Sequence, residues 1–133
     1  MEKIISSGKR KRAVARAILM SGTGKVSVNR IDYEKLQFFD KLKMQEPLRI
    51  AEYILGKPNF NAEITVKGGG ARGQIEAARI ALAKGIVAFS REDKLKRAYQ
   101  EYDRNLLVAD VRRKEAYKPG DSKARAKRQK SFR

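Results

Sequence analysis

The chain has 133 residues, of which 32 are Lys or Arg and 15 are Asp or Glu, so its formal net charge is +17. This length fits one domain, 41% hydrophobic residues suffice for a core, and the excess of positive charge predicts a polyanionic partner. Because Cys and His are both absent, disulfides, thiolate nucleophiles, histidine bases and the usual zinc ligands are excluded, which closes most familiar enzyme chemistries. From the chain as a whole we expect no enzymatic activity, metal, cofactor or small-molecule substrate.

The first predicted elements are two strands joined by a turn. The stretch from Lys11 to Met20 has strand character, and residues 21–24 (SGTG) are a turn signal. Val26 and Val28 then alternate with polar residues, as in a half-buried strand. The sequence therefore predicts that these two strands pair as a β-hairpin.

A helical region follows. Residues 33–39 predict a short helical turn, and Pro47 fits the first position of a helix, where its missing N–H is tolerated. This helix is predicted to end at Gly56, and its apolar residues share one face: Leu48, Ala51 and Leu55.

The clearest periodicity lies in residues 60–67, where apolar and polar residues alternate. It predicts a strand that runs directly into three glycines, residues 68–70. Past the glycines, helical spacing predicts a helix whose buried stripe holds Ile75, Ala78, Leu82, Ile86 and Phe89.

A last helix is predicted to follow. Ser90 and Asp93 resemble a capping box that opens a helix through about Tyr102, with Leu95 and Tyr99 on one side. The aromatic residues that fall in apolar patterns are expected in the core: Phe38, Phe39, Tyr53, Phe60 and Phe89.

The chain is predicted to divide into two parts. Residues 1–102 hold nearly all the large aliphatic residues and form the predicted globular α+β domain, whereas residues 103–133 form an extended basic C-terminal tail. Residues 106–108 (LLV) are enough to dock the start of the tail on the domain. The last twelve residues hold six basic residues, no acid and one bulky apolar residue, Phe132, so they cannot fold alone.

The glycine loop admits several interpretations. Its G-x-G-x-x-G spacing fits a dinucleotide site, but no second strand with an acidic ribose ligand follows. A P-loop lacks its Gly-Lys-Ser/Thr, and the GXXG loop of KH domains joins two helices instead of following a strand. Two interpretations stay open: phosphate contact at the start of the next helix, beside Lys67 and Arg72, or a sharp turn that needs positive φ angles.

Basic residues recur along the whole chain. Residues 9–12 (KRKR) lead into the first predicted strand, and Arg16 is expected on the same face as Arg10 and Arg12. A solvated run and a localisation signal are alternatives for residues 9–12. Phosphate contact is favoured because the same bias returns throughout the tail.

A membrane is the other polyanionic surface to consider. No apolar run approaches the roughly 18 residues that span a bilayer, and the N-terminus lacks a secretory signal, so we expect a cytoplasmic protein. Coating an anionic membrane would require a helix with a basic face and an opposite Trp/Phe/Leu face, and Trp is absent. Nucleic acid is therefore the favoured partner, with no membrane contact.

Three segments together resemble the small-subunit ribosomal protein S nine family. Residues 68–86 (GGGARGQIEAARIALAKGI) match its signature region throughout. Residues 8–16 (GKRKRAVAR) are similar to its basic first strand, and residues 110–120 (DVRRKEAYKPG) are similar to its tail entry. The ending QKSFR resembles the archaeal and eukaryotic branch, and the short N-terminus favours an archaeal source.

The resemblance implies a fold and a function. The fold is a mixed β-sheet with helices packed on one face and a left-handed βαβ crossover, against the general right-handed preference. The function is structural, in the head of the small ribosomal subunit, on 16S-type rRNA and beside neighbouring head proteins. The end of the tail is expected to reach the anticodon stem-loop of P-site tRNA.

Site residues follow from the charge pattern and from the resemblance. The predicted rRNA-binding residues are Lys9, Arg10, Lys11, Arg12, Arg16, Lys67, Gly69, Gly70, Arg72, Gln74, Arg112, Arg113, Lys118, Lys123, Arg125, Lys127 and Arg128. The predicted tRNA-binding residues are Lys130, Ser131, Phe132 and Arg133, with Phe132 where bacterial members have Lys.

Two rival functions would use the same residues. A nucleotide-dependent enzyme built on the glycine loop would show saturable nucleotide binding or dependence on a divalent metal. A free-standing DNA-compacting protein would bind duplex DNA as tightly as rRNA and would not co-sediment with small subunits.

Overall fold

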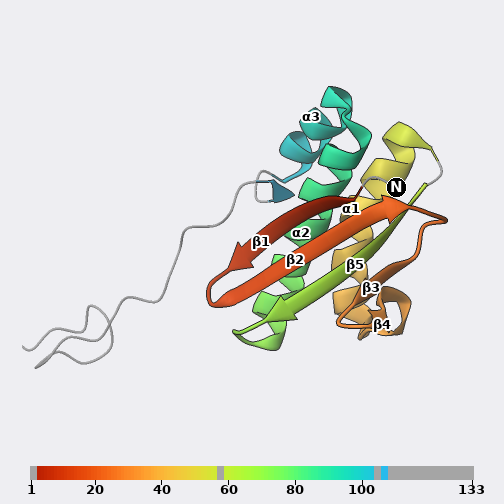
Figure 1. Cartoon of the computed structure of the whole chain (residues 1–133). Coiled ribbons are helices and arrows are strands. Elements are labelled where there is room, and N and C mark those ends of the chain that lie inside the picture. Colours follow the sequence, from red (N-terminus) through yellow and green to blue (C-terminus); the bar gives the residue numbers. More distant parts are fainter. Residues whose placement is uncertain (1–2, 57–58, 104–105, 108–133) are drawn as a thin grey trace, which may run out of the picture.

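The computed structural model describes residues 3–56, 59–103 and 106–107. The strands are β1 (Ile4–Arg10), β2 (Ala13–Ser21), β3 (Val26–Val28), β4 (Ile31–Asp32) and β5 (Phe60–Lys67). The helices are the short 3-10 helix η1 (Tyr33–Lys35), α1 (Phe38–Leu55), α2 (Ala71–Ser90) and α3 (Asp93–Tyr102). The strands form one mixed sheet in the order β1-β2-β5-β3-β4, with the helices on one face, which is the predicted α+β class (Figure 1).

Strand β1 was not predicted, and it changes the pairing of the others. β2 pairs antiparallel with β1 and β5, whereas β3 pairs parallel with β5. The predicted hairpin between residues 11–20 and the strand of Val26 and Val28 is therefore wrong, because β5 lies between them. An alternating pattern predicts which face of a strand is buried, but it does not predict which strand pairs with it.

The connection from β3 to β5 crosses the helical face of the sheet. The two strands are parallel neighbours, and the chain between them passes through α1. Figure 1 shows α1 behind the sheet, so the step from β3 to β5 is a left-handed crossover. This is the hand that the family resemblance implied, and general preference would have given the opposite one.

Helix α1 begins earlier than predicted. Pro47 lies inside it and not at its first position, so the interior of the helix tolerates a residue without an N–H. Burial of Met44, Pro47 and Ala51 against the core offsets the backbone hydrogen bond that Pro47 cannot donate. In addition, the buried Tyr99 hydroxyl donates to the Pro47 carbonyl at 2.7 Å. The predicted end is confirmed, since Gly56 caps the helix with a φ of 85°.

The two later helices agree with the sequence except at their junction. On α2 the predicted stripe is buried, with Phe89 only half-buried, and on α3 Leu95 and Tyr99 are buried. The capping box is wrong: Ser90 is the last residue of α2, and its hydroxyl donates to the Val87 carbonyl of the same helix. Glu92 is the N-cap of α3 and makes no side-chain cap bond.

Small residues set the distance between α2 and the sheet. Alanines line both sides of this contact, namely Ala13, Ala15 and Ala17 on β2 and Ala77, Ala78 and Ala81 on α2. At Gly8 of β1, an added Cβ would lie 2.4 Å from the Ala77 carbonyl oxygen. The close approach requires glycine there, and it holds the start of α2 against the end of the β1–β2 hairpin.

The predicted aromatic core is only partly present. Phe60 is buried and stacks edge-on against Phe89, with ring centroids 5.9 Å apart. Phe38, Phe39 and Tyr53 are 68%, 75% and 89% exposed, so placing them in the core was wrong. They lie on the outer side of α1, whose inner side is also apolar, and periodicity alone could not separate the two sides.

The start of the predicted tail docks on the domain. Leu106 is fully buried, and Leu107 packs against the core as a half-buried residue. Val108 and everything after it lie outside the described residues, so the division near residue 103 stays a prediction.

Candidate nucleic-acid interface

Basic side chains gather at one end of the sheet. The β1–β2 turn, the end of β5, the β3–β4 turn and the start of α2 all lie there, as strand directions and register require (Figure 1). We call this the basic end and define it by six exposed residues: Lys9, Lys11, Arg12, Arg30, Lys67 and Arg72.

The glycine loop is folded tightly against the β1–β2 turn. Gly68 and Gly69 have φ angles of 81° and 66°, which favour glycine. An added Cβ on Gly68 would lie 2.6 Å from the Arg12 carbonyl oxygen, and the Gln74 side chain donates to the Gly68 carbonyl at 3.1 Å. The sharp-turn interpretation is thus present in the structure, and Gln74 supports the loop.

Open space and free amides lie on the other side of the same loop. Gly70 is the N-cap of α2 in an extended conformation, and an added Cβ there would meet nothing within 4 Å. Among the described residues, no side chain caps the helix, and its first turn holds no acidic residue. The first amides of α2 and the positive end of its dipole therefore face outward between the described basic residues, an arrangement that suits a phosphate.

One predicted site residue has a structural partner. Arg10 Nε donates to the Glu76 carboxylate at 2.6 Å, and Lys43 Nζ lies 3.4 Å from the other oxygen. Burial alone would raise the pKa of Glu76, but the hydrogen bond and charge of Arg10, with the charge of Lys43, outweigh it and lower the pKa. Arg10 therefore ties β1 to α2 under the basic end.

Arg16 lies on the open face of the sheet, opposite the face that the described helices cover (Figure 1). It stands opposite Ser7 of β1 and Thr65 of β5. The expectation that it shares a face with Arg10 is wrong, because the chain reverses between Arg10 and Ala13, and Arg10 points toward α2. Arg12 is exposed in the turn that leads into β2. Arg16 extends the basic surface from the end of the sheet onto its open face.

Two turns of the basic end carry basic residues where glycine would be favoured. Lys11 has a φ of 55°, and Arg30 a φ of 69° next to Asn29 at 50°. A left-handed conformation costs a residue with a Cβ roughly 1–2 kcal/mol relative to the usual one. Arg30 was not among the predicted site residues; Asn29, which tolerates this conformation, was the available signal of a turn.

Charge is unevenly divided between the layers of the described chain. Residues 3–32 and 59–74, which form the sheet, its loops and the first turn of α2, hold ten basic residues and two acids, Asp32 and Glu63. Residues 33–56 and 75–103, which form most of the helical layer, hold ten basic and nine acidic residues. The net positive charge of the described domain therefore lies on the sheet and its basic end.

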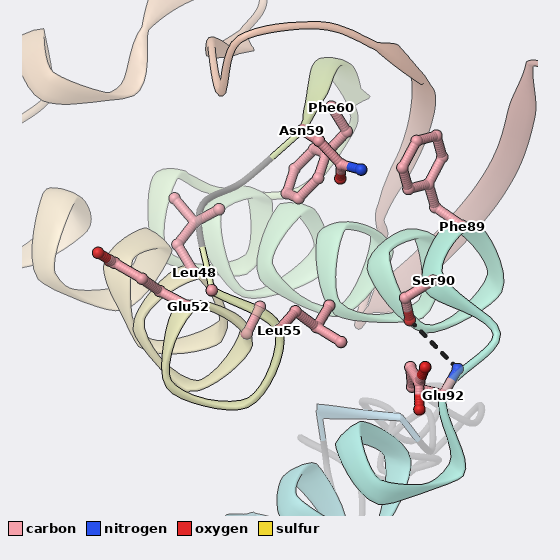
Figure 2. Close-up of a pocket in the computed structure, with 10 residues that line it drawn as sticks. Leu48, Glu52, Leu55, Asn59, Phe60, Phe89, Ser90 and Glu92 are labelled. Atoms are coloured by element: carbon pink, nitrogen blue, oxygen red, sulfur yellow. Dashed lines mark hydrogen bonds between the residues drawn. The ribbon is translucent and has the colours of Figure 1, made fainter.

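A cavity of about 260 Å³ lies away from the basic end, between α1, α2 and the starts of β5 and α3 (Figure 2). Figure 2 shows Glu52 and Glu92 on opposite sides of it, and the Ser90 hydroxyl bonded to the Glu92 backbone N–H. The described lining offers no paired nucleophile and base. Among the described residues there is also no cluster of three metal-ligating side chains and no helix able to cross a membrane.

The remaining predicted site residues cannot be placed. Those of the tail lie outside the described residues: Arg112, Arg113, Lys118, Lys123, Arg125, Lys127, Arg128, Lys130, Ser131, Phe132 and Arg133.

Comparison with known proteins gives one consistent family. Residues 8–133 match the family described as Ribosomal protein S9/S16. The chain is 43% identical over 134 residues to the small ribosomal subunit protein uS9 of Methanothrix thermoacetophila, with both chains covered in full. It is 44% identical to the protein of the same name from Pyrobaculum aerophilum, over 98% of this chain and 91% of the relative. The Thermoplasma volcanium protein of that name is 43% identical, with full coverage of both.

Proposed function

Because the chain belongs to the ribosomal protein S9/S16 family, in its archaeal type, we propose that it is a structural constituent of the small ribosomal subunit in the cytoplasm. It acts there without enzymatic chemistry. Its basic end binds 16S-type rRNA, neighbouring head proteins pack beside it, and its C-terminal tail reaches the anticodon stem-loop of P-site tRNA.

The division of charge is the observation that carries the rRNA proposal. Nearly all the net charge of the described domain lies on the sheet and the basic end, so a polyanion is attracted to that side and gains little from the nearly neutral helical layer. The open space at Gly70 and the free amides of α2 give a phosphate direct access to the backbone. Recognition through RNA shape and phosphate spacing fits such a surface.

The backbone of the turns supports the same proposal. Lys11 and Arg30 keep basic side chains in left-handed conformations that glycine would adopt without cost. Strained residues of this kind are typical of functional positions. Glycine at these two tips of the sheet would increase stability, so we infer that the basic side chains are kept for the charge they supply to binding.

Removing three charges from the basic end tests the proposal. In one variant Arg12, Lys67 and Arg72 become Ala; in the matched control Lys94, Lys96 and Arg97 of α3, which are equally exposed, become Ala. Both lose the same charge. Binding to the head domain of 16S-type rRNA is measured over a range of salt concentrations. For the first variant, the magnitude of the slope of log K against log salt is expected to be smaller than that of wild type by about 2 to 3. The control keeps the wild-type slope within about 1, and equal losses in both would contradict the proposal.

The tail proposal rests on composition and on the family. Residues 130–133 close a stretch of twelve residues with six cations and no acid, which favours contact with RNA phosphates. We expect deletion of these four residues to leave assembly largely intact and to weaken P-site tRNA retention. Phe132→Ala and Arg133→Ala, measured separately, distinguish base stacking from phosphate contact. Equal loss of assembly and tRNA binding would contradict this division of labour.

A further inference from the structure

Helix α1 carries an apolar outer face in addition to its buried one. Phe38, Phe39, Leu42 and Tyr53 are 68%, 75%, 39% and 89% exposed. At 100° per residue these four side chains fall within about 100° of one another, on the side opposite Met44, Pro47 and Ala51. Phe38 and Phe39 stack edge-on, with ring centroids 5.5 Å apart.

A groove runs beside this face. It has a volume of about 350 Å³ and is lined by Leu42, Gln45, Glu46, Arg49, Ile50 and Tyr102. Tyr102, the last residue of α3, forms its far wall and is 55% exposed. We call the four exposed residues and the groove the α1 outer face. Tyr, Phe and Arg around aliphatic residues are the composition enriched in the centres of protein–protein interfaces.

We propose that the α1 outer face is the docking surface for another protein of the small subunit, which inserts an apolar side chain into the groove. The inference rests on the proposed function, because it requires a multi-protein particle. Exposed apolar patches of this kind are typical of surfaces that are covered in an assembly.

Charge separates this surface from the RNA-binding one. The helical layer to which it belongs holds ten basic and nine acidic residues, so it offers RNA little net attraction. Glu46 of the groove is already paired with Arg79 of α2, and Arg49 donates to Gln45 on its own helix. Arg49 stays exposed and charged at the groove, and the rest of the lining outside these pairs is aromatic and aliphatic: Leu42, Ile50 and Tyr102.

Two other occupants fit the surface less well. Residues 108–133 hold ten basic and three acidic residues and few bulky apolar ones, so this chain's own tail offers little to fill an apolar groove. A second copy would bring together two molecules that each carry +17, and such molecules repel. A different protein with an apolar segment meets neither obstacle.

Photo-crosslinking inside the particle tests the proposal directly. The full-length protein carries benzoylphenylalanine in place of Phe39 and is assembled into small subunits, which are purified, irradiated and analysed by mass spectrometry. The expected product joins position 39 to another small-subunit protein. A crosslink to rRNA, to residues 108–133 or to a second copy, or the absence of any crosslink, would overturn the proposal.

The same reagent in place of Arg12 separates this inference from the proposed function. Position 12 lies in the basic end and is expected to crosslink to rRNA. An rRNA crosslink from position 12 without a protein crosslink from position 39 would overturn the docking surface alone. Loss of the position 12 crosslink would count against the rRNA interface itself.

A paired set of variants gives an independent readout. Phe38→Ser with Phe39→Ser changes two exposed residues, so the fold is expected to persist. Affinity for protein-free rRNA is expected to stay within about twofold of wild type, while retention in salt-washed small subunits falls roughly tenfold or more. The variant in which Arg12, Lys67 and Arg72 become Ala is expected to show the reverse order, with its main loss in affinity for protein-free rRNA. Unchanged retention of the Phe variant would overturn the proposal.

Discussion

Replacing Glu76 by Gln is expected to destabilise the domain by about 2 kcal/mol at neutral pH. The carboxylate accepts a hydrogen bond from Arg10 Nε at 2.6 Å and lies 3.4 Å from Lys43 Nζ, and its side chain is 32% exposed. Charge-assisted hydrogen bonds contribute about 1.5–3 kcal/mol, and a more exposed ion pair such as that with Lys43 adds about 0.2–1 kcal/mol. Gln can still accept from Arg10, so the loss is expected near the lower end.

The pH dependence provides the sharper test. The pKa of Glu76 is lowered in the folded protein, so its stabilising contribution is present above the unfolded pKa and is lost as the pH falls through the folded value. The free energies of unfolding of wild type and Glu76→Gln, measured in urea, should therefore differ at pH 7 and become equal below about pH 4. Glu63→Gln, on the open face of the sheet, is the control and is expected to change stability by less than about 0.5 kcal/mol. A difference between wild type and Glu76→Gln that is absent at pH 7, or constant with pH, would refute the reasoning.

Two further predictions concern the glycine loop and the turn beside it. Gly68→Ala is expected to lower the free energy of unfolding by at least about 2 kcal/mol, because it combines a positive φ with a 2.6 Å approach to the Arg12 carbonyl; Gly70→Ala, in open space, should cost less than about 1 kcal/mol. Equal costs in thermal or urea unfolding would show that the loop packs differently. Lys11→Gly relieves a left-handed lysine, so it should gain up to about 1 kcal/mol of stability while weakening rRNA binding; a gain in both quantities would contradict a phosphate contact at this residue.

The elements predicted correctly are those whose period is strong and local. β5 alternates without interruption, and α2 keeps one apolar stripe over about four turns, so both follow from burial of a single face. β1 escaped prediction because its middle residues are two Ser and Gly8, and the glycine is explained only by the approach of α2. The order of the strands could not be predicted from local patterns, because β5, which comes much later in the chain, lies between β2 and β3.

The structure locates several predicted site residues and corrects the placement of others. The sequence predicts phosphate contact by a basic run that leads into a strand from Lys11, whereas Lys11 and Arg12 lie in the exposed turn before β2. Arg10 differs because its partner, Glu76, is 66 residues away, a contact that no local pattern contains. Arg30 joins the same end of the sheet only through the parallel pairing of β3 with β5.

Sedimentation tests the central claim most directly. Cell extract is separated on a sucrose gradient at moderate and then at high salt, and this protein is detected in each fraction. We expect the protein to stay with the small ribosomal subunit through the high-salt wash. Migration as free protein, or with chromosomal DNA, would show that it is not a structural constituent of the subunit.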